Sequence, residues 1–260
     1  MTEYIPSDDG TRIACDIVGD GPPIILIGGA MQFRAFAPAT GQLAQLLAER
    51  GLTAVHYDRR GRGETASAAI GPVERELEDV AALIDRVGGP AALFGHSSGG
   101  AIALLAAHRG LGVNRVAVFE VPLPPSRARQ SDAYRDDLVD LVNAGNLEAA
   151  TEFFMNDMPP ERLAAAKAGP AWPTMVQMAP SLVADADALA FAYLSPQEWA
   201  RFRQPVLLMV GESTRPIFTE AAEALAAKIP NTTSRQVAAR DHSWEPPAMA
   251  DVLAEFFGGA

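Results

Sequence analysis

The chain has 260 residues, 48% of them hydrophobic, and carries a formal net charge of −11 at neutral pH. The length suits one large domain or a domain with an insertion, and the apolar fraction is enough for a sizeable core. The acidic balance argues against nucleic acid or an anionic membrane as a partner. A single cysteine, Cys15, excludes an internal disulfide.

The first residues do not show the basic segment followed by an apolar one that a secretory signal requires. The longest apolar runs, such as Ile24 to Ile27, are far too short to span a bilayer. We therefore expect a soluble, cytoplasmic protein.

Strands and helices alternate from residue 1 to residue 121. Runs of β-branched and apolar residues bounded by glycine and proline predict strands at 3–6, 11–18, 24–27, 53–57, 91–94 and 115–120. Apolar residues spaced three and four apart predict helices at 38–50, 73–87 and 98–110.

The pattern changes between residues 122 and 199, where the sequence contains no convincing strand. Prolines punctuate short helical stretches near 131–144, 146–156, 160–168 and 181–192. Beyond this segment the pattern predicts strands at 205–211 and 232–238, and helices at 217–229 and 247–257.

This order predicts a mostly parallel sheet covered by helices and interrupted by a helical insertion. We expect a core domain of residues 1–121 and 200–260, and a helical cap, or lid, of residues 122–199. The insertion follows the carboxyl end of a strand, and ligands of open α/β sheets bind at that edge. The insertion is therefore predicted to cover a binding site.

The most informative motif is Gly95-His96-Ser97-Ser98-Gly99, between a predicted strand and a predicted helix. A tight turn between them holds the Ser97 hydroxyl out of the sheet, and small neighbours prevent a clash. Free N–H groups and the dipole at the helix start favour negative charge there. The motif predicts a nucleophilic serine, and an ordinary glycine-rich turn is the alternative.

Four motifs, in this order, make the chain resemble the α/β-hydrolase fold superfamily. They are an oxyanion-type loop, a turn like Asp-x-Arg-Gly-x-Gly, the serine elbow and a histidine loop: Ile27-Gly28-Gly29-Ala30, Tyr57-Asp58-Arg59-Arg60-Gly61-Arg62-Gly63, Gly95 to Gly100, and Asp241-His242. The resemblance covers nearly the whole chain and is weakest through the insertion. It implies a mostly parallel, eight-stranded α/β sheet with helices on both faces and a helical lid.

A serine hydroxyl needs a base to take its proton, and the base needs an orienting acid. His242 follows the last predicted strand, in the Ser…acid…His order of the superfamily, and is the candidate base. The superfamily usually has an aspartate after its seventh strand, but Thr214 stands near that position. Glu120 ends the preceding predicted strand and is the candidate acid, because a buried carboxylate needs a partner. Glu212, or a Ser–His dyad without an acid, is the alternative.

Two backbone N–H groups are expected to form the oxyanion hole, one from Ser98 and one from Ala30 or Met31. Apolar side chains of the first loop and of the insertion are the predicted lining of the substrate pocket: Met31, Phe33, Phe154, Met158, Trp172 and Met175. Flexible methionines suit an apolar or bulky substrate. The alternative is that most of these residues form the core of the lid itself.

We expect a serine hydrolase that cleaves an ester, lactone or thioester of a small apolar substrate through an acyl-enzyme on Ser97. The alternatives are cofactor-free haloperoxidase or perhydrolase chemistry, C–C bond hydrolysis, or a ligand-binding protein without turnover. The sequence has no clustered metal-ligand spacing and no phosphate-binding loop, so neither a metal nor a cofactor is expected. The expected partner is a small apolar molecule, and the expected assembly is a monomer or homodimer.

Overall fold

The computed structural model describes residues 1–65, 71–122, 132–156, 158–190 and 194–258. In this part of the chain one sheet contains all the strands: β1 (Glu3–Pro6), β2 (Arg12–Val18), β3 (Pro23–Ile27), β4 (Thr53–Tyr57), β5 (Ala91–His96), β6 (Val113–Phe119), β7 (Val206–Ser213), β8 (Thr232–Arg240) and β9 (Ser243–Trp244).

The sheet is mostly parallel, as predicted, with the strand order β1-β2-β4-β3-β5-β6-β7-β8-β9. The pairs β1–β2, β2–β4 and β8–β9 are antiparallel, and every pair between β4 and β8 is parallel. The expected count of eight strands was wrong, because nine are present among the described residues. The additional strand, β9, has two residues and pairs with the end of β8, which is too short a segment for a periodic signal.

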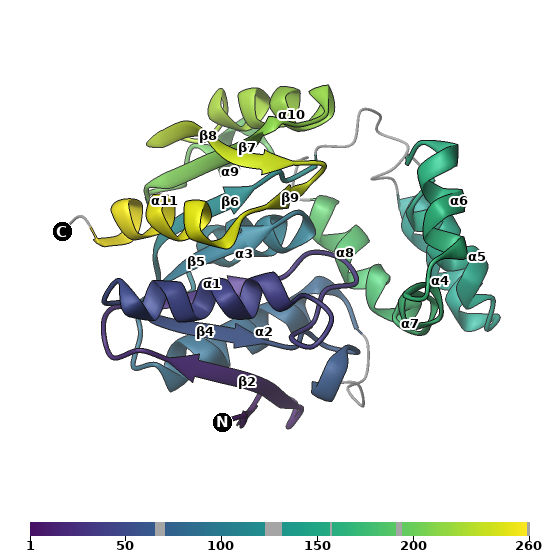
Figure 1. Ribbon diagram of the computed structural model, residues 1–260, viewed down its shortest axis with the longest axis horizontal. Helices are drawn as coiled ribbons and strands as arrows, with labels where there is room; N and C mark the ends of the chain where they lie inside the picture. The colour runs from purple at the N-terminus through teal and green to yellow at the C-terminus, as the bar shows by residue number, and fades with distance from the viewer. Residues whose placement is uncertain (66–70, 123–131, 157, 191–193, 259–260) are drawn as a thin grey trace.

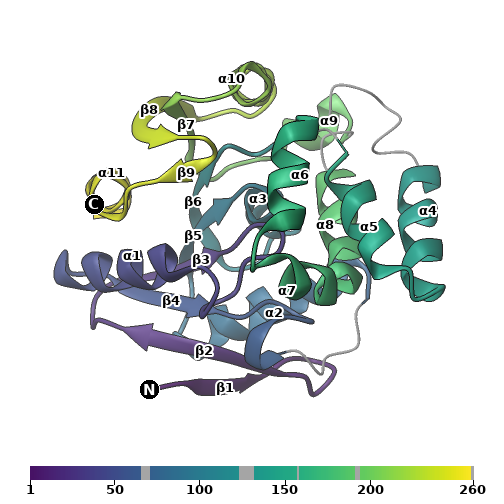
Figure 2. The ribbon, with the colours of Figure 1, turned by 45° about the vertical axis from the view of Figure 1, so that its right-hand side comes forward.

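Helices cover both faces of the sheet, because its central strands are apolar on both sides. Ile25 and Ile27 of β3 pack in the cluster beneath α2 (Val73–Arg86), α3 (Ser98–His108) and α10 (Pro216–Ala226). Ile24 and Leu26 point the other way, toward α1 (Pro38–Glu49) and α11 (Pro246–Gly258). Figure 2 shows α1 and α11 together on one side of the sheet.

A helical segment separates β6 from β7, as the sequence predicts. It contains α4 (Asp132–Asn143), α5 (Leu147–Phe154), α6 (Pro160–Ala168), α7 (Trp172–Gln177), α8 (Leu182–Leu189) and α9 (Pro196–Trp199). The described residues of 122–199 contain no strand. Figure 1 shows α4 to α7 gathered on one side of the molecule, with α8 between them and the sheet. None of the described helices has the length and apolar character needed to cross a membrane.

The parallel strands place four chain segments at one edge of the sheet. Ile27 pairs with Gly95, His96 with Phe119, and Phe119 with Met209, so β3, β5, β6 and β7 end close together. The residues that follow these strands therefore meet at their carboxyl ends, where the candidate site lies.

Candidate active site

Ser97 lies in a strained turn between β5 and α3. Its backbone has φ 55° and ψ −126°, outside the regions that non-glycine residues commonly adopt. A Cβ atom on Gly95 would lie 2.4 Å from Cα of Gly100, and one on Gly99 would lie 2.3 Å from the carbonyl oxygen of Ile27. Glycine is therefore required on both sides of Ser97, and the tight turn presents its side chain at the end of β5.

Backbone strain is concentrated around this serine. Six described residues other than glycine have positive φ angles, and five of them border the same edge of the sheet: Met31, Ser97, Glu120, Asp241 and His242. Such conformations cost of order 1–3 kcal/mol each and cluster at functional sites. This concentration makes the edge a candidate functional site.

His242 is hydrogen-bonded to a buried carboxylate. Its Nδ1 lies 2.6 Å from Oε2 of Glu120, and the backbone N–H of Gly211 donates to the other carboxylate oxygen at 3.0 Å. Burial disfavours the Glu120 carboxylate, but these hydrogen bonds outweigh that effect and lower its pKa. An ionised carboxylate only accepts hydrogen bonds, so Nδ1 is the donor of this bond and Nε2 is the ring nitrogen left for another partner.

The other acidic candidates lie elsewhere. Glu212 is exposed near the end of β7. Asp241 is also exposed, and its carboxylate forms an ion pair of 2.6 Å with Arg162 of α6. The structure thus brings Glu120, rather than either of these residues, to His242.

The imidazole of His242 also has an aromatic neighbour. Its ring is stacked on Phe218 of α10, with 4.4 Å between ring centroids and 3° between planes. This contact and the Glu120 hydrogen bond fix the ring from two sides. Ser97 and His242 line the same cavity.

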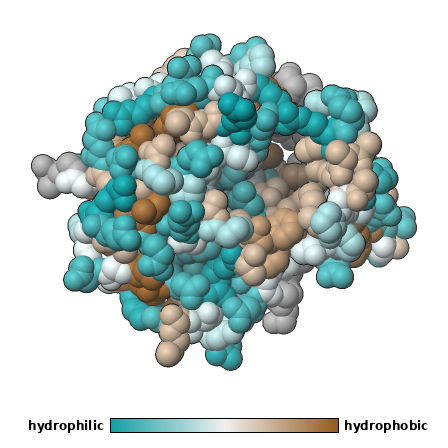
Figure 3. All heavy atoms as spheres, in the orientation of Figure 1, coloured by the Kyte–Doolittle hydropathy of each residue, from teal (hydrophilic) through white to brown (hydrophobic). Residues whose placement is uncertain are grey.

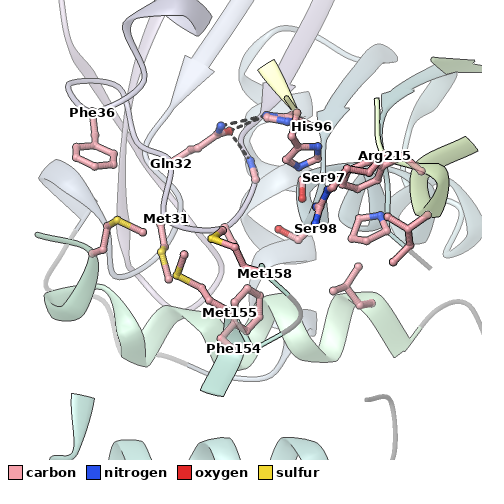
Figure 4. Close-up of a pocket in the computed structure, with 18 residues that line it drawn as sticks. Met31, Gln32, Phe36, His96, Ser97, Ser98, Phe154, Met155, Met158 and Arg215 are labelled. Carbon is pink, nitrogen blue, oxygen red and sulfur yellow. Dashed lines mark hydrogen bonds between the residues drawn. The ribbon is translucent and has the colours of Figure 1, made fainter. Parts of the chain in front are cut away.

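The loop after β3 is held in place by Gln32, which sequence reasoning missed. The side-chain oxygen of Gln32 accepts the N–H of Gly29 at 2.7 Å, and its amide lies 3.0 Å from Nδ1 of His96 (Figure 4). Burial holds the pKa of His96 well below its usual range, so this ring is neutral. Ala30 and Ser98 both border the cavity, and Ser98 begins α3, where N–H groups have no intrahelical partner.

A buried ionic network supports this loop from behind. Asp185 of α8 pairs with Arg59 and Arg62, and these three side chains are at most 1% exposed. Arg59 donates to the carbonyl oxygen of Gly28, and Arg62 donates to that of Gly29. The Ser98 hydroxyl donates to Asp185 at 2.6 Å.

One signal for this network is visible in the sequence of α8, Leu182–Leu189 (LVADADAL). In it, two carboxylates, Asp185 and Asp187, stand among apolar residues, and Asp185 is the one that is fully buried. A buried carboxylate requires partners, and these are the arginines of the second motif.

The cavity has a volume of about 310 Å³ and a mostly apolar lining. Four predicted pocket residues border it: Met31, Phe154, Met158 and Met175. Further lining residues include Phe36, Met155, Ile217 and Phe218. Figure 3 shows the surface hollowed between the sheet and the insertion.

Two predicted pocket residues, Phe33 and Trp172, do not line the cavity. Phe33 is stacked on Phe36 at 5.5 Å and packs with the apolar cluster of the insertion. Trp172 is buried, and its Nε1 donates to Glu148 of α5 at 3.1 Å. Trp172 therefore fits the alternative expectation, that such residues form the core of the insertion rather than the pocket lining.

No cluster of three or more His, Cys, Asp or Glu side chains suited to a metal ion occurs in the described part of the chain. The residues that border the cavity also include one arginine, Arg215, at the start of α10.

The alpha/beta hydrolase family model matches residues 20–256 of the chain. Comparison with curated proteins gives no match. An alpha/beta hydrolase from Sphaerobacter thermophilus is similar in structure, with a TM-score of 0.84 and 37% identity over 98% of this chain and 100% of that chain.

Two further structures are more distant. An esterase from Exiguobacterium antarcticum has a TM-score of 0.69 and 18% identity over 100% of both chains. A meta-cleavage product hydrolase from Pseudomonas fluorescens has a TM-score of 0.65 and 16% identity over 98% of this chain and 97% of that chain. At these identities the likeness concerns the fold alone.

Proposed function

Since the chain belongs to the alpha/beta hydrolase family, we propose that it is a serine hydrolase whose nucleophile is Ser97. The proposed substrates are esters, lactones or thioesters with a small, mostly apolar acyl group. The main support is the arrangement of one cavity, in which a strained serine and a histidine bonded to a buried carboxylate both form part of the lining.

In the proposed reaction, Nε2 of His242 takes the proton of the Ser97 hydroxyl as its oxygen attacks the carbonyl carbon. The Glu120 carboxylate stabilises the imidazolium that forms. The backbone N–H groups of Ala30 and Ser98 donate to the oxyanion of the tetrahedral intermediate. His242 then returns the proton to the leaving oxygen or sulfur, whose bond to the acyl carbon breaks.

The second half of the reaction releases the acyl group. Water attacks the acyl carbon of the Ser97 ester and gives a proton to His242. Collapse of the second tetrahedral intermediate returns that proton to Ser97 and frees a carboxylic acid. The network of Arg59, Arg62 and Asp185 keeps the Gly28–Gly29 loop in place during both steps.

We also propose that residues 122–199 act as a cap. Phe154 of α5, Met175 of α7 and Leu189 of α8 contribute to the cavity lining. The ion pair between Arg162 and Asp241 joins α6 to the loop that carries His242. The substrate would therefore be enclosed between the cap and the carboxyl ends of the strands.

The test is covalent labelling with a fluorophosphonate probe, combined with a panel of p-nitrophenyl esters, lactones and thioesters. Wild-type protein should be labelled and should hydrolyse members of the panel. Ser97→Ala should lose both properties, whereas Ser234→Ala, at an exposed serine of β8, should keep them. Persistent labelling of Ser97→Ala would overturn the assignment.

The same nucleophile also suits perhydrolase or C–C hydrolase chemistry, so assays for these two reactions are run beside the ester panel. Peroxide-dependent bromination in acetate, or cleavage of a β-diketone bond, should be slower than hydrolysis of the best ester. Either activity in the absence of ester hydrolysis would reassign the reaction.

A further inference from the structure

Arg215 is the unusual member of the cavity lining. Among the described residues that border the cavity it is the one arginine, and neither an aspartate, a glutamate nor a lysine accompanies it. No ion pair joins Arg215 to a carboxylate in the described part of the chain. Figure 4 shows its side chain extending toward Ser97.

The position of the Arg215 side chain is well defined. Its residue has an extended backbone (φ −78°, ψ 144°), and α10 begins at the next residue, Pro216. Its carbonyl oxygen accepts the N–H of Phe218 at 3.0 Å, which fixes the turn into the helix. The guanidinium carbon lies 4.8 Å from the centroid of the Phe218 ring, and that ring is stacked on His242. The cation therefore lies against Phe218, the ring that is stacked on His242.

Nothing described in the cavity neutralises this charge. The His96 ring is neutral, since burial lowers its pKa. Glu120 is the nearest carboxylate to His242, but its two oxygens are bonded to His242 and to the Gly211 N–H. The residue before Arg215 is the neutral Thr214, because the acidic partner of His242 comes from the end of β6 instead. Arg215 is partly exposed, so water can accompany its charge before a substrate binds, and a substrate anion would take the place of that water.

We propose that Arg215 binds a carboxylate of the substrate, distinct from the acyl group that Ser97 attacks. This inference rests on the proposed function and narrows its substrates to carboxylate-bearing esters, lactones or thioesters with an apolar remainder. A guanidinium donates two parallel N–H groups to a planar carboxylate, and one positive charge balances one negative charge. A dianionic phosphate would require further cations that the described lining lacks.

The size of the cavity agrees with this class. A volume of about 310 Å³ is at the lower end of ligand pockets, which suits an acyl chain of a few carbons. In such a substrate the methylene groups would face the methionines, and the carboxylate would face Arg215. The overall charge of −11 does not attract anions, so a local cation has to provide the recognition.

The test compares two p-nitrophenyl esters of the same shape. One carries a glutarate acyl group with a free carboxylate, and the other carries the corresponding terminal amide. Wild-type protein should favour the carboxylate ester at least tenfold in kcat/KM, mainly through KM, because the interaction exists before the reaction. Added salt should reduce the preference, because salt screens the interaction of the two charges.

Arg215→Met keeps the length of the side chain but removes its charge. The carboxylate-to-amide ratio of kcat/KM should fall at least tenfold in this variant, and Arg215→Lys should retain part of the preference. Arg203→Met is the matched control, because Arg203 is exposed and hydrogen-bonds to nearby backbone carbonyls, so its ratio should equal that of wild type. An unchanged ratio in Arg215→Met, or no preference in wild type, would overturn the proposal.

A binding measurement separates this proposal from the proposed function. Calorimetric titration of Ser97→Ala protein with each ester needs no turnover. Tighter binding of the carboxylate ester, lost in the double variant Ser97→Ala, Arg215→Met, supports recognition by Arg215 even if wild type hydrolyses no ester. Equal binding of both esters contradicts it even if hydrolysis is observed.

Discussion

The carboxylate of Glu120, at the end of β6, is the proposed partner that orients His242 and stabilises its imidazolium. Its left-handed backbone (φ 49°) turns the side chain into the sheet edge, where Oε2 meets Nδ1 of His242 at 2.6 Å. Glu120→Gln keeps the shape but removes the charge. Turnover should fall on the order of a hundredfold or more, within the range seen when a triad acid is neutralised. The imidazolium also loses its counter-charge, so the acid limb of the pH–activity profile should move to lower pH.

Glu212→Gln provides the comparison. The Glu212 carboxylate is exposed, so its neutralisation should reduce turnover little. Steady-state kinetics across pH for both variants decides between the two acids. If Glu212→Gln lost most of its turnover and Glu120→Gln kept that of wild type, Glu212 would be the acid instead of Glu120. Wild-type turnover in both variants would indicate a Ser97–His242 dyad without an acid.

For single residues, the sequence points to those candidates that stand in local motifs or at a set place in the chain order. Ser97 and His242 belong to such motifs, and the absence of an aspartate near Thr214 makes Glu120 the favoured candidate acid, with Glu212 as the alternative. Pocket residues depend instead on which way a side chain faces. Phe33 and Phe36 are in one loop and only Phe36 borders the cavity, a difference that no periodicity encodes.

Helix α8 connects the insertion to the proposed active site through Asp185. Asp185→Asn would leave Arg59 with Glu76 alone and Arg62 without a carboxylate, both inside the core. Breaking a buried ion pair in this way typically costs about 3–5 kcal/mol. The free energy of unfolding, from urea denaturation, should fall by that order, and activity should fall with it as the Gly28–Gly29 loop loses support.

The same helix offers a matched control. Asp187 lies two residues from Asp185 and pairs with Arg135 at 2.6 Å, with the Arg135 side chain 40% exposed. Asp187→Asn should cost less than Asp185→Asn, about 1 kcal/mol, because Arg135 is 40% exposed and can return to water, although Asp187 itself is only 13% exposed. Equal losses of stability in the two variants would show that the buried network has no special role.

Elements with strong periodicity are predictable from the sequence, and short ones are not. The helices of the core and the strands from β1 to β8 are found within a few residues of their predicted bounds. The six residues of α7, with Pro173 near their start, and the two residues of β9 fall below the length at which a pattern exists. Their positions are set by tertiary packing, including the strained turn at Asp241 and His242.

Across the whole molecule, buried histidines couple stability to pH. His56 of β4 is 5% exposed, and burial lowers its pKa to about 4. His96 is also buried, with a pKa well below its usual range. In the unfolded chain a histidine titrates near pH 6.5. Between about pH 6.5 and about pH 4, His56 is therefore protonated in the unfolded state and neutral in the folded state. The stabilisation is therefore complete above about pH 6.5 and is lost as the pH falls to about 4.

His56→Gln tests this coupling, because glutamine does not titrate. Urea denaturation at several pH values between 7.5 and 4 should show wild type losing stability as the pH falls, with His56 contributing on the order of 3 kcal/mol. The variant can be less stable at pH 7.5, but its stability should depend less steeply on pH. His108→Gln is the control, since His108 is less buried and should affect the slope less. A slope in His56→Gln equal to that of wild type would mean that His56 takes up its proton without unfolding, and acid sensitivity would then belong to His96 and the paired carboxylates.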